Sequence, residues 1–392
     1  MTVHEIDRRL GAHIAADELP GLAWLVAIGD DVTTGAIGHL DAAGTTPVRT
    51  DTIFRISSMT KPLTAVATSI LIDDGVLDPA EPVDALLPEL ADRRVLANPA
   101  AELTDTVPAN RPITVDDLLT FRLGWGMDFA DFAPTPLDAA WNDLELGWGP
   151  PTPARMPAPN TWLARLGTLP LRYQPGERWL YHVGASVLGL LVARAAGRPL
   201  SEFLADRVLR PLGMADTGFS VPAEKLARFS PHYAEIDGAR TVFDPVDGQW
   251  STPPAFEGGG DGLVSTLADY HRFARMLRDG GALDGTRILS ERAVTAMTTN
   301  HLTPEQLARG GPSPDGSAGW GYGVGVQLRD LPDGPRAGAY GWAGGLGSIW
   351  STDGPVIAIL LTDQSWGSAG PPPVFATFER ILGELARTAD PL

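Results

Sequence analysis

The stretch Phe54-Arg55-Ile56-Ser57-Ser58-Met59-Thr60-Lys61 decides how the fold of this chain is interpreted. It contains a serine, Ser58, and a lysine, Lys61, three positions later. Side chains at this spacing share one face of a helix, so the Lys61 amine can reach the Ser58 hydroxyl. A serine hydroxyl becomes a nucleophile when a base takes its proton. The pKa of an amine falls when the amine is removed from water, so a buried lysine can act as that base near neutrality. The pair is therefore a candidate nucleophile and base.

The residues around this pair predict where the helix starts and stops. A helix is predicted from about 58 to 74, and Gly75 is a suitable residue to end it. Pro62 stands where it removes at most the first helical hydrogen bond, which fixes the start close to Ser58. The Ser58 amide then lies at a helix N-terminus, where it can point at an anion.

The composition narrows the classes of protein to which this chain of 392 residues can belong. Its net charge of −18 repels phosphate backbones, so we expect no nucleic-acid partner. The absence of cysteine excludes disulfides, thiolate metal sites and a cysteine nucleophile. The seven histidines show no H-x-x-x-H or H-E-x-x-H spacing, so we expect no metal site and no cofactor.

The apolar segments are short. None approaches the roughly 20 residues that a membrane-spanning helix needs. The N-terminal residues 1–10 have no apolar core and carry acids among their bases, which is unlike a signal peptide. We therefore expect no membrane span and a cytoplasmic location, unless a leader has been removed. The oligomeric state stays open.

Hydrophobic periodicity predicts helices at both ends and in the middle of the chain, with strands between them. The predicted helices are 3–18, 58–74, 114–120, 159–167, 183–196, 199–209, 267–279 and 373–388, and the predicted strands are 22–28, 32–39, 322–328, 340–351 and 356–362. This order indicates an α+β fold in which both chain ends build one sheet. Residues 1–75 and 256–392 then form the sheet domain, and residues 76–255 form a mostly helical domain beside it.

Residues 125–176 differ from the rest of the helical domain because they are rich in tryptophan and proline and show little periodicity. A long irregular segment inside a compact domain often forms a lid or a binding wall. The alternative is a surface insertion whose tryptophans pack onto the core. Both interpretations stay open.

Two further segments contain residue types suited to acyl-transfer chemistry. In Trp179-Leu180-Tyr181-His182-Val183-Gly184 a tyrosine precedes a predicted helix. A cationic lysine nearby would lower the pKa of the Tyr181 hydroxyl, so that it is held as phenolate or shuttles a proton. The alternative is a core tyrosine, and His182 is either a modifier of a neighbouring pKa or an exposed histidine at a helix start.

The other segment is Gly341-Trp342-Ala343-Gly344-Gly345-Leu346-Gly347-Ser348-Ile349-Trp350. Its glycines let the backbone approach a ligand closely. The alternative is an ordinary glycine-rich strand.

Together these segments resemble the superfamily of class C β-lactamases, penicillin-binding D-Ala-D-Ala peptidases and family VIII carboxylesterases. The resemblance extends from Leu22 to about Thr362. It includes the connecting phrases Asp74-Gly75-Val76-Leu77-Asp78-Pro79, Thr114-Val115-Asp116-Asp117-Leu118-Leu119-Thr120, Pro211-Leu212-Gly213-Met214 and Gly262-Leu263-Val264-Ser265-Thr266. The resemblance implies an antiparallel sheet flanked by the N- and C-terminal helices, an inserted all-helical region, and a site between them.

The resemblance also implies roles for individual residues. The nucleophile of the family falls on Ser58, its lysine on Lys61 and its tyrosine on Tyr181. The oxyanion hole would consist of the backbone amides of Ser58 and Gly345. Each such donor typically contributes about 3 kcal/mol to stabilising the transition state.

Two departures from the family pattern bear on the substrate. The usual Tyr-x-Asn motif is here Tyr181-His182-Val183, so the amide that would contact a β-lactam side chain is missing. The usual Lys or His of the third motif is here Trp342, so a cation for a substrate carboxylate is missing. Both changes favour neutral, more apolar acyl substrates, and a Trp-x-Gly third motif is also a feature of family VIII carboxylesterases and related acyltransferases.

The residues expected to contact the substrate belong to these motifs and to the tryptophan-rich segment. They are Trp342, Ala343, Gly344, Trp125, His182 and Val183. An arginine elsewhere could still supply a substitute charge, and the candidates are Arg122, Arg155 and Arg172.

The resemblance therefore implies a serine hydrolase that forms a covalent acyl-enzyme, with carboxylesterase activity on small-molecule esters as the preferred interpretation. Three alternatives stay open. They are an acyltransferase of a biosynthetic pathway, a β-lactamase or D-amino-acid peptidase that acts on amides, and a catalytically silent binding module.

Overall fold

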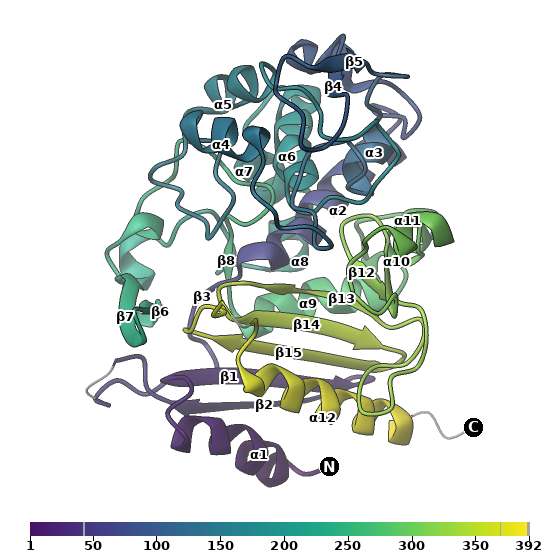
Figure 1. Ribbon diagram of the computed structural model, residues 1–392. Coiled ribbons are helices and arrows are strands. Elements are labelled where there is room, and N and C mark those ends of the chain that lie inside the picture. Colours follow the sequence, from purple (N-terminus) through teal and green to yellow (C-terminus); the bar gives the residue numbers. More distant parts are fainter. Residues whose placement is uncertain (42–43, 369, 390–392) are drawn as a thin grey trace.

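The computed structural model describes residues 1–41, 44–368 and 370–389 (Figure 1). A seven-stranded antiparallel sheet forms its base, in the strand order β11-β12-β13-β14-β15-β1-β2. The strands are β1 (Gly21–Ile28), β2 (Asp31–Gly38), β11 (Ala318–Trp320), β12 (Gly325–Gln327), β13 (Tyr340–Gly344), β14 (Ser348–Asp353) and β15 (Val356–Thr362). Strands from the two ends of the chain meet where β1 pairs with β15, so the antiparallel sheet predicted from the family resemblance is confirmed.

Strand β1 shows why helices cover both faces of this sheet. Its side chains alternate between the faces, as in any strand. Leu22, Trp24 and Val26 pack with apolar residues of the terminal helices, whereas Ala23 and Leu25 belong to the large core on the opposite face. Since both alternating sets are apolar, the strand is stable only when both faces are covered.

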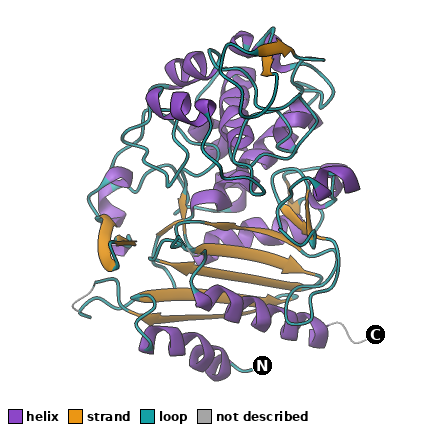
Figure 2. Ribbon diagram, in the orientation of Figure 1, coloured by secondary structure: helices purple, strands orange, loops and turns teal. Residues whose placement is uncertain are grey.

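Helices from distant parts of the chain form those two covering layers (Figure 2). α1 (Val3–Ala15) and α12 (Pro373–Ala389) contact each other and cover one face, where α1 contacts β2 and α12 contacts β15. α9 (Leu267–Arg278) contacts β1 and β15 from the other side. The predicted α+β architecture is therefore present.

The helical region lies on the far side of α9 from the terminal helices (Figure 1). Its helices are α2 (Thr60–Asp73), α3 (Val115–Leu119), α4 (Pro136–Asp143), α5 (Pro159–Leu166), α6 (Val183–Ala196), α7 (Leu200–Leu204) and α8 (Arg210–Leu212). α2 and α6 are buried along almost their whole length and pack against each other. The packing of α2 against α6 therefore holds the first turn of α2 in place between the helical region and the sheet.

Short elements complete the fold. The paired strands are β3 (Phe54–Arg55) with β8 (Val264–Ser265), β4 (Arg94–Leu96) with β5 (Thr106–Pro108), β6 (His232–Ile236) with β7 (Ala239–Asp244), and β9 (Ala282–Leu283) with β10 (Thr286–Arg287). Two more helices are α10 (Glu291–Thr298) and α11 (Pro304–Ala308). The β3–β8 pair leads directly into the 3-10 turn Ser57–Met59 that precedes α2.

Two predicted strands differ from the observed ones. The segment 340–351 is a hairpin of β13 and β14, because Gly347 has φ 85° and its amide donates to the carbonyl of Gly344. The segment 322–328 contains only β12, with Gly323 at φ 74° before it. Positive φ favours glycine, and such residues interrupt a strand pattern with a turn.

Within the described residues, no single helix is long and apolar enough to cross a membrane. One bent pair, Val183–Ala196 with Leu200–Leu212, passes the length and composition test together, at an angle of 77°. The first helix of that pair is the buried core helix α6.

Candidate active site

Ser58 lies in the 3-10 turn at the start of α2, with its side chain almost buried. The preceding residue, Ser57, has φ 44°, a left-handed conformation that is uncommon for a residue with a Cβ. The chain therefore turns sharply between β3 and α2. This turn directs Ser58 toward the space between the sheet and the helical region.

Lys61 is fully buried, and all its polar contacts lie within this site. Its Nζ donates to the carbonyl of Gly260 at 2.7 Å and lies 2.9 Å from Ser58 Oγ, to which the ammonium form donates. His182 Nδ1 lies 3.3 Å from the same Nζ. Burial lowers the pKa of Lys61 to about 7, and the charge of Asp261 opposes this shift. A substantial fraction of the amine is therefore neutral near pH 7 and able to accept the Ser58 proton.

Tyr181 lies on the opposite side of Lys61 from α2. The Lys61 Nζ is 4.6 Å from the centre of its ring, and the indole Nε1 of Trp342 donates to its hydroxyl at 2.7 Å. Burial raises the pKa of Tyr181 well above its ordinary value, and hydrogen bonds with Ser58 and Trp342 only partly offset this. Of the two predicted states, a phenolate or a proton shuttle, the raised pKa favours the neutral phenol, which has a proton to donate.

The two residues whose amides were predicted to form the oxyanion hole, Ser58 and Gly345, line the same cavity. Ser58 N belongs to the 3-10 turn, and Gly345 N belongs to the turn between β13 and β14; within the described chain neither amide donates a hydrogen bond to a protein acceptor. The hydroxyl of Ser348 donates to the carbonyl of Ile56 at 2.8 Å, which ties β14 to the nucleophile segment. The role of these two amides as an oxyanion hole, which the family resemblance implied, stays a prediction.

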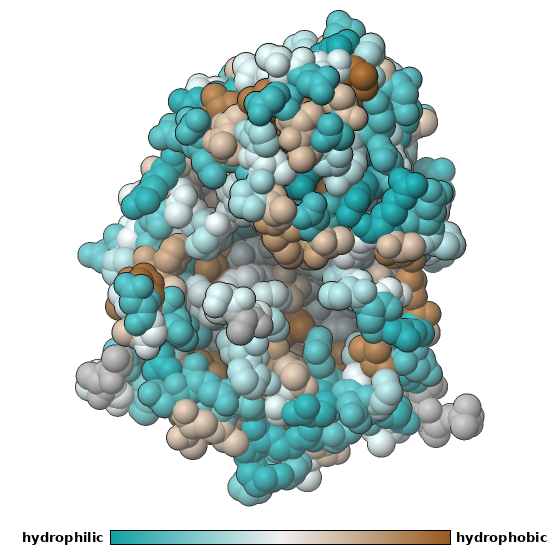
Figure 3. Space-filling model, in the orientation of Figure 1, coloured by the Kyte–Doolittle hydropathy of each residue, from teal (hydrophilic) through white to brown (hydrophobic). Residues whose placement is uncertain are grey.

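A cavity of about 650 Å³ lies in front of Ser58, where the surface is hollowed between the helical region and the sheet (Figure 3). Its wall combines residues from many elements. They are Ser57, Ser58, Met127, Phe129, Trp148, Gly149, Pro150, Pro151, Tyr181, His182, Ala234, Asp261, Pro312, Trp342, Ala343, Gly345, Ser365 and Trp366. No arginine or lysine is among these described residues, so the cavity has no cation to hold a substrate carboxylate.

The structure brings only part of the predicted substrate-contacting set to this cavity. Trp342, Ala343 and His182 line it, but Trp125 does not. The Trp125 indole is fully buried and donates to the carbonyl of Pro170 at 2.7 Å, so the prediction of substrate contact was wrong for this core residue.

Gly344 and Val183 also differ from the prediction. Gly344 is buried behind the nucleophile, where an added Cβ would meet the Ile56 carbonyl at 2.4 Å. This glycine therefore permits close approach of β13 to the turn at Ser57. Val183 faces a separate, smaller cavity behind His182.

The three arginines considered as a substitute charge for a substrate carboxylate are ion-paired with other residues or are absent from the cavity wall. Arg122 pairs with Asp116 at 2.6 Å, and Arg172 lies 3.9 Å from Asp131. Arg155 is exposed on the tryptophan-rich segment. That segment contributes Met127, Phe129 and Trp148 to the wall, whereas its Trp141 and Trp162 are buried in the core.

Sequence reasoning missed two features of the site. Asp261 belongs to the loop Gly258-Gly259-Gly260-Asp261-Gly262, directly before the connecting phrase that begins at Gly262, and its carboxylate lies 3.7 Å from His182 Nε2. The second feature is the hydrogen bond from Trp342 to Tyr181, because Trp342 was considered only as a replacement for the family's cation and as a substrate contact. A lone acidic residue in a glycine-rich loop was the one available signal for Asp261.

The nucleophile segment is held in place by a buried ion pair. Arg55, directly before Ile56, donates to the carboxylate of Asp244 and to the carbonyl of Ser230 at 2.6 Å. Its guanidinium lies 4.1 Å from the centre of the Phe229 ring. Both charged side chains are almost inaccessible, so this pair fixes β3 against β7.

Comparison with known proteins identifies the family of this chain. A family model described as Beta-lactamase matches residues 6–370. The chain belongs to this family. Esterases, acyltransferases and penicillin-binding proteins are among its relatives.

Individual relatives cover most of the chain. Protein Rv1367c of Mycobacterium tuberculosis is 38% identical over 335 residues, which are 83% of this chain and 80% of that protein. Esterase EstB of Burkholderia gladioli is 30% identical over 361 residues, which are 86% of this chain and 84% of that protein. The unliganded simvastatin synthase LovD from Aspergillus terreus shares the fold, with a TM-score of 0.79 at 23% identity over 97% of this chain and 98% of that chain.

Proposed function

We propose that this protein is a serine carboxylesterase that acts on neutral, fairly apolar esters through an acyl-enzyme on Ser58. The observation that carries the proposal is the 2.9 Å contact between Ser58 Oγ and the buried Lys61 amine. The Ser58–Lys61 pair lies beside a cavity, and no arginine or lysine is among the described residues that line this cavity. The name of the relative EstB, an esterase, agrees with this assignment.

In the acylation step Lys61 accepts the proton of Ser58 while Oγ forms a bond to the ester carbonyl carbon. The amides of Ser58 and Gly345 hold the negative oxygen of the tetrahedral intermediate. Tyr181 gives its proton to the leaving alkoxide as the bond between carbonyl carbon and alcohol oxygen breaks. The Lys61 ammonium then supplies a proton to the tyrosine, so the site returns to its starting charge.

Deacylation repeats these steps with water as the nucleophile. As the water oxygen attacks the acyl carbon, Tyr181 accepts one proton of the water and passes its own phenolic proton to the Lys61 amine, which becomes an ammonium and later returns a proton to Ser58. Ser58 leaves as the alkoxide and regains its proton. The net reaction consumes one ester and one water and releases one acid and one alcohol.

The walls of the cavity support an apolar substrate. Phe129, Trp148, Trp342 and Trp366 contribute aromatic surface, and Met127 adds an adaptable thioether side chain. The volume of about 650 Å³ lies within the usual range of roughly 300–1,000 Å³ for small-molecule sites. A carboxylate substrate would be buried here without a cation, which is costly.

Acyl transfer to an alcohol is the second candidate function. The cavity has room for an acyl group together with an acceptor, and the fold is shared with the simvastatin synthase LovD. The chemistry needs only an alcohol in place of water. Added alcohol separates the candidates, because a transferase should give mostly the new ester and an esterase mostly the acid.

The test compares initial rates on p-nitrophenyl butyrate and nitrocefin for the wild type and Ser58→Ala. Fast ester turnover with little nitrocefin hydrolysis, both lost in the variant, would support the proposal. Dominant nitrocefin turnover would favour a β-lactamase. Ester turnover that survives in Ser58→Ala would refute the assigned nucleophile.

A further inference from the structure

The backbone at His182 has an unusual conformation for a residue with a side chain. Its φ is 86° and its ψ is −60°, and the amide of Val183 donates to the carbonyl of Tyr181 at 3.3 Å. This is a three-residue turn of the rare kind that costs conformational energy. It directs two consecutive side chains, Tyr181 and His182, toward the same Lys61 amine.

The contacts of Lys61 determine where its lone pair points. A neutral amine has two N–H groups and one lone pair. The Gly260 carbonyl, 2.7 Å away, only accepts, so it takes one N–H. If His182 Nδ1, 3.3 Å away, takes the other, the lone pair faces Ser58 Oγ at 2.9 Å. Without that acceptor the second N–H is free to rotate toward Ser58, and the amine then cannot take the serine proton.

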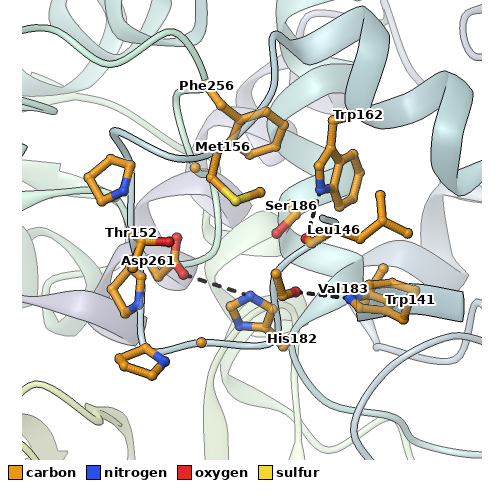
Figure 4. A pocket seen from close by; sticks show the side chains of 17 residues that line it. Trp141, Leu146, Thr152, Met156, Trp162, His182, Val183, Ser186, Phe256 and Asp261 are labelled. Carbon is orange, nitrogen blue, oxygen red and sulfur yellow. Dashed lines mark hydrogen bonds and ion pairs between the residues drawn. The ribbon is translucent and has the colours of Figure 1, made fainter. Parts of the chain in front are cut away.

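Nδ1 of a neutral histidine accepts only when the ring proton is on Nε2. Asp261 lies on that side, with a carboxylate oxygen 3.7 Å from Nε2, and the two side chains point toward each other in Figure 4. A negative charge at this position favours the proton on Nε2. Burial lowers the pKa of His182 well below its ordinary value, so the ring is neutral, and burial raises the pKa of Asp261 to about 6, so the carboxylate is ionised above that pH.

We propose that His182 is a positioning residue that orients the Lys61 lone pair toward Ser58, and that Asp261 selects the tautomer of His182 that can do so. This inference rests on the proposed function, because it concerns the orientation of Lys61, the base of that reaction. The ionisable side chains that face Lys61 are Tyr181 and His182 from the segment before α6 and Asp261 from the loop before β8.

The test measures the rate at which a fluorophosphonate labels Ser58, followed by intact-mass spectrometry of the full-length protein. In this reaction Ser58 Oγ bonds to phosphorus, fluoride leaves, and Lys61 takes the serine proton. The step needs no knowledge of the natural substrate. It reports directly on the nucleophile and its base.

The matched variants are His182→Asn and His182→Gln. The Asn oxygen occupies the place of Nδ1 and still accepts from Lys61, whereas the longer Gln places its amide near the position of Nε2. We expect Gln to lower the labelling rate about 100-fold, the usual cost of misaiming a catalytic group, and Asn to recover most of the wild-type rate. Because both variants are polar amides, a difference between them reports on the acceptor rather than on folding.

Asp261→Asn provides a second, pH-dependent readout. The negative charge of Asp261 raises the pKa of Lys61. In Asp261→Asn, the pH midpoint at which acid lowers the labelling rate should therefore shift to lower pH. A purely structural role would not move that midpoint. An unchanged midpoint would mean that Asp261 places no negative charge in the site, and the selection of the His182 tautomer by that charge would be refuted.

The outcomes separate this inference from the proposed function. Absence of labelling in the wild type, or labelling that persists in Ser58→Ala, would refute the nucleophile itself. Wild-type labelling at Ser58 with equal rates for the Asn and Gln variants would leave the nucleophile in place and overturn the positioning role of His182.

Discussion

The hydrogen bond from Trp342 to Tyr181 gives the most specific prediction for the catalytic step. The substitution is Trp342→Phe, which keeps an aromatic ring and removes the indole N–H. In the structure this N–H lies 2.7 Å from the phenol oxygen, and Tyr181 is only 9% exposed. Little solvent is therefore present to replace the lost donor.

The size of the effect follows from the charge that Tyr181 carries during the reaction. When the phenol gives its proton to the leaving alkoxide, its oxygen becomes negative, and the bond from the indole becomes charge-assisted. Such bonds contribute about 1.5–3 kcal/mol. At about 1.36 kcal/mol for each tenfold change in rate, Trp342→Phe should lower kcat/KM roughly 10- to 150-fold.

The assay uses two esters of the same acid, ethyl butyrate and p-nitrophenyl butyrate. The ethoxide must be protonated to leave, whereas p-nitrophenolate leaves as a stable anion. The full loss is therefore expected on ethyl butyrate and a much smaller loss on p-nitrophenyl butyrate. Trp148→Phe is the matched control, since Trp148 lines the same cavity and stacks on Trp141 without contacting Tyr181, so any effect should fall on KM.

Two results would refute this reasoning. Equal losses on both esters would mean that Trp342 acts by shaping the cavity rather than by stabilising the tyrosine oxygen. An unchanged rate on ethyl butyrate would mean that Tyr181 does not protonate the leaving group.

Three other predictions follow from the site and its supports. Acylation should fall about tenfold for each pH unit below a midpoint near 7, because acid protonates Lys61 and removes the base; a stopped-flow profile without this limb would contradict the lowered pKa. Lys61→Ala should abolish acylation in mass spectra while thermal unfolding shows an intact fold, and an active, folded variant would exclude Lys61 as the base. Asp244→Ala should cost about 3–5 kcal/mol in urea unfolding, because it leaves the Arg55 charge buried and unpaired, whereas Asp74→Ala at an exposed ion pair should change stability little; similar values for both would show that the buried pair is unimportant.

Local patterns in the sequence were sufficient for the elements that present the catalytic groups. The spacing of Ser58 and Lys61 on one helical turn places the two side chains together in any helix, and the structure finds them 2.9 Å apart. The apolar run of β1 and the amphipathic terminal helices likewise predicted a sheet built from both chain ends. These features depend on neighbours in sequence or on simple periodicity.

The same patterns could not show which tryptophans line the cavity. Trp125 and Trp148 are both in the tryptophan-rich segment, yet one is a core residue and the other a wall residue. Burial of an aromatic side chain depends on which elements pack over it. That information is not present in the local composition.

The sequence by itself predicted the Ser58–Lys61 pair on one helical face and a sheet built from both chain ends, because motif spacing and hydrophobic periodicity are local properties, and the resemblance to a known family added the role predicted for Tyr181. Only the tertiary structure showed that burial raises the pKa of Tyr181, which favours the neutral phenol. It also brought Asp261 within 3.7 Å of His182 and the indole of Trp342 within 2.7 Å of Tyr181. These contacts join residues far apart in the chain, and both their geometry and the loss of solvent around them arise only when the helical region packs against the sheet.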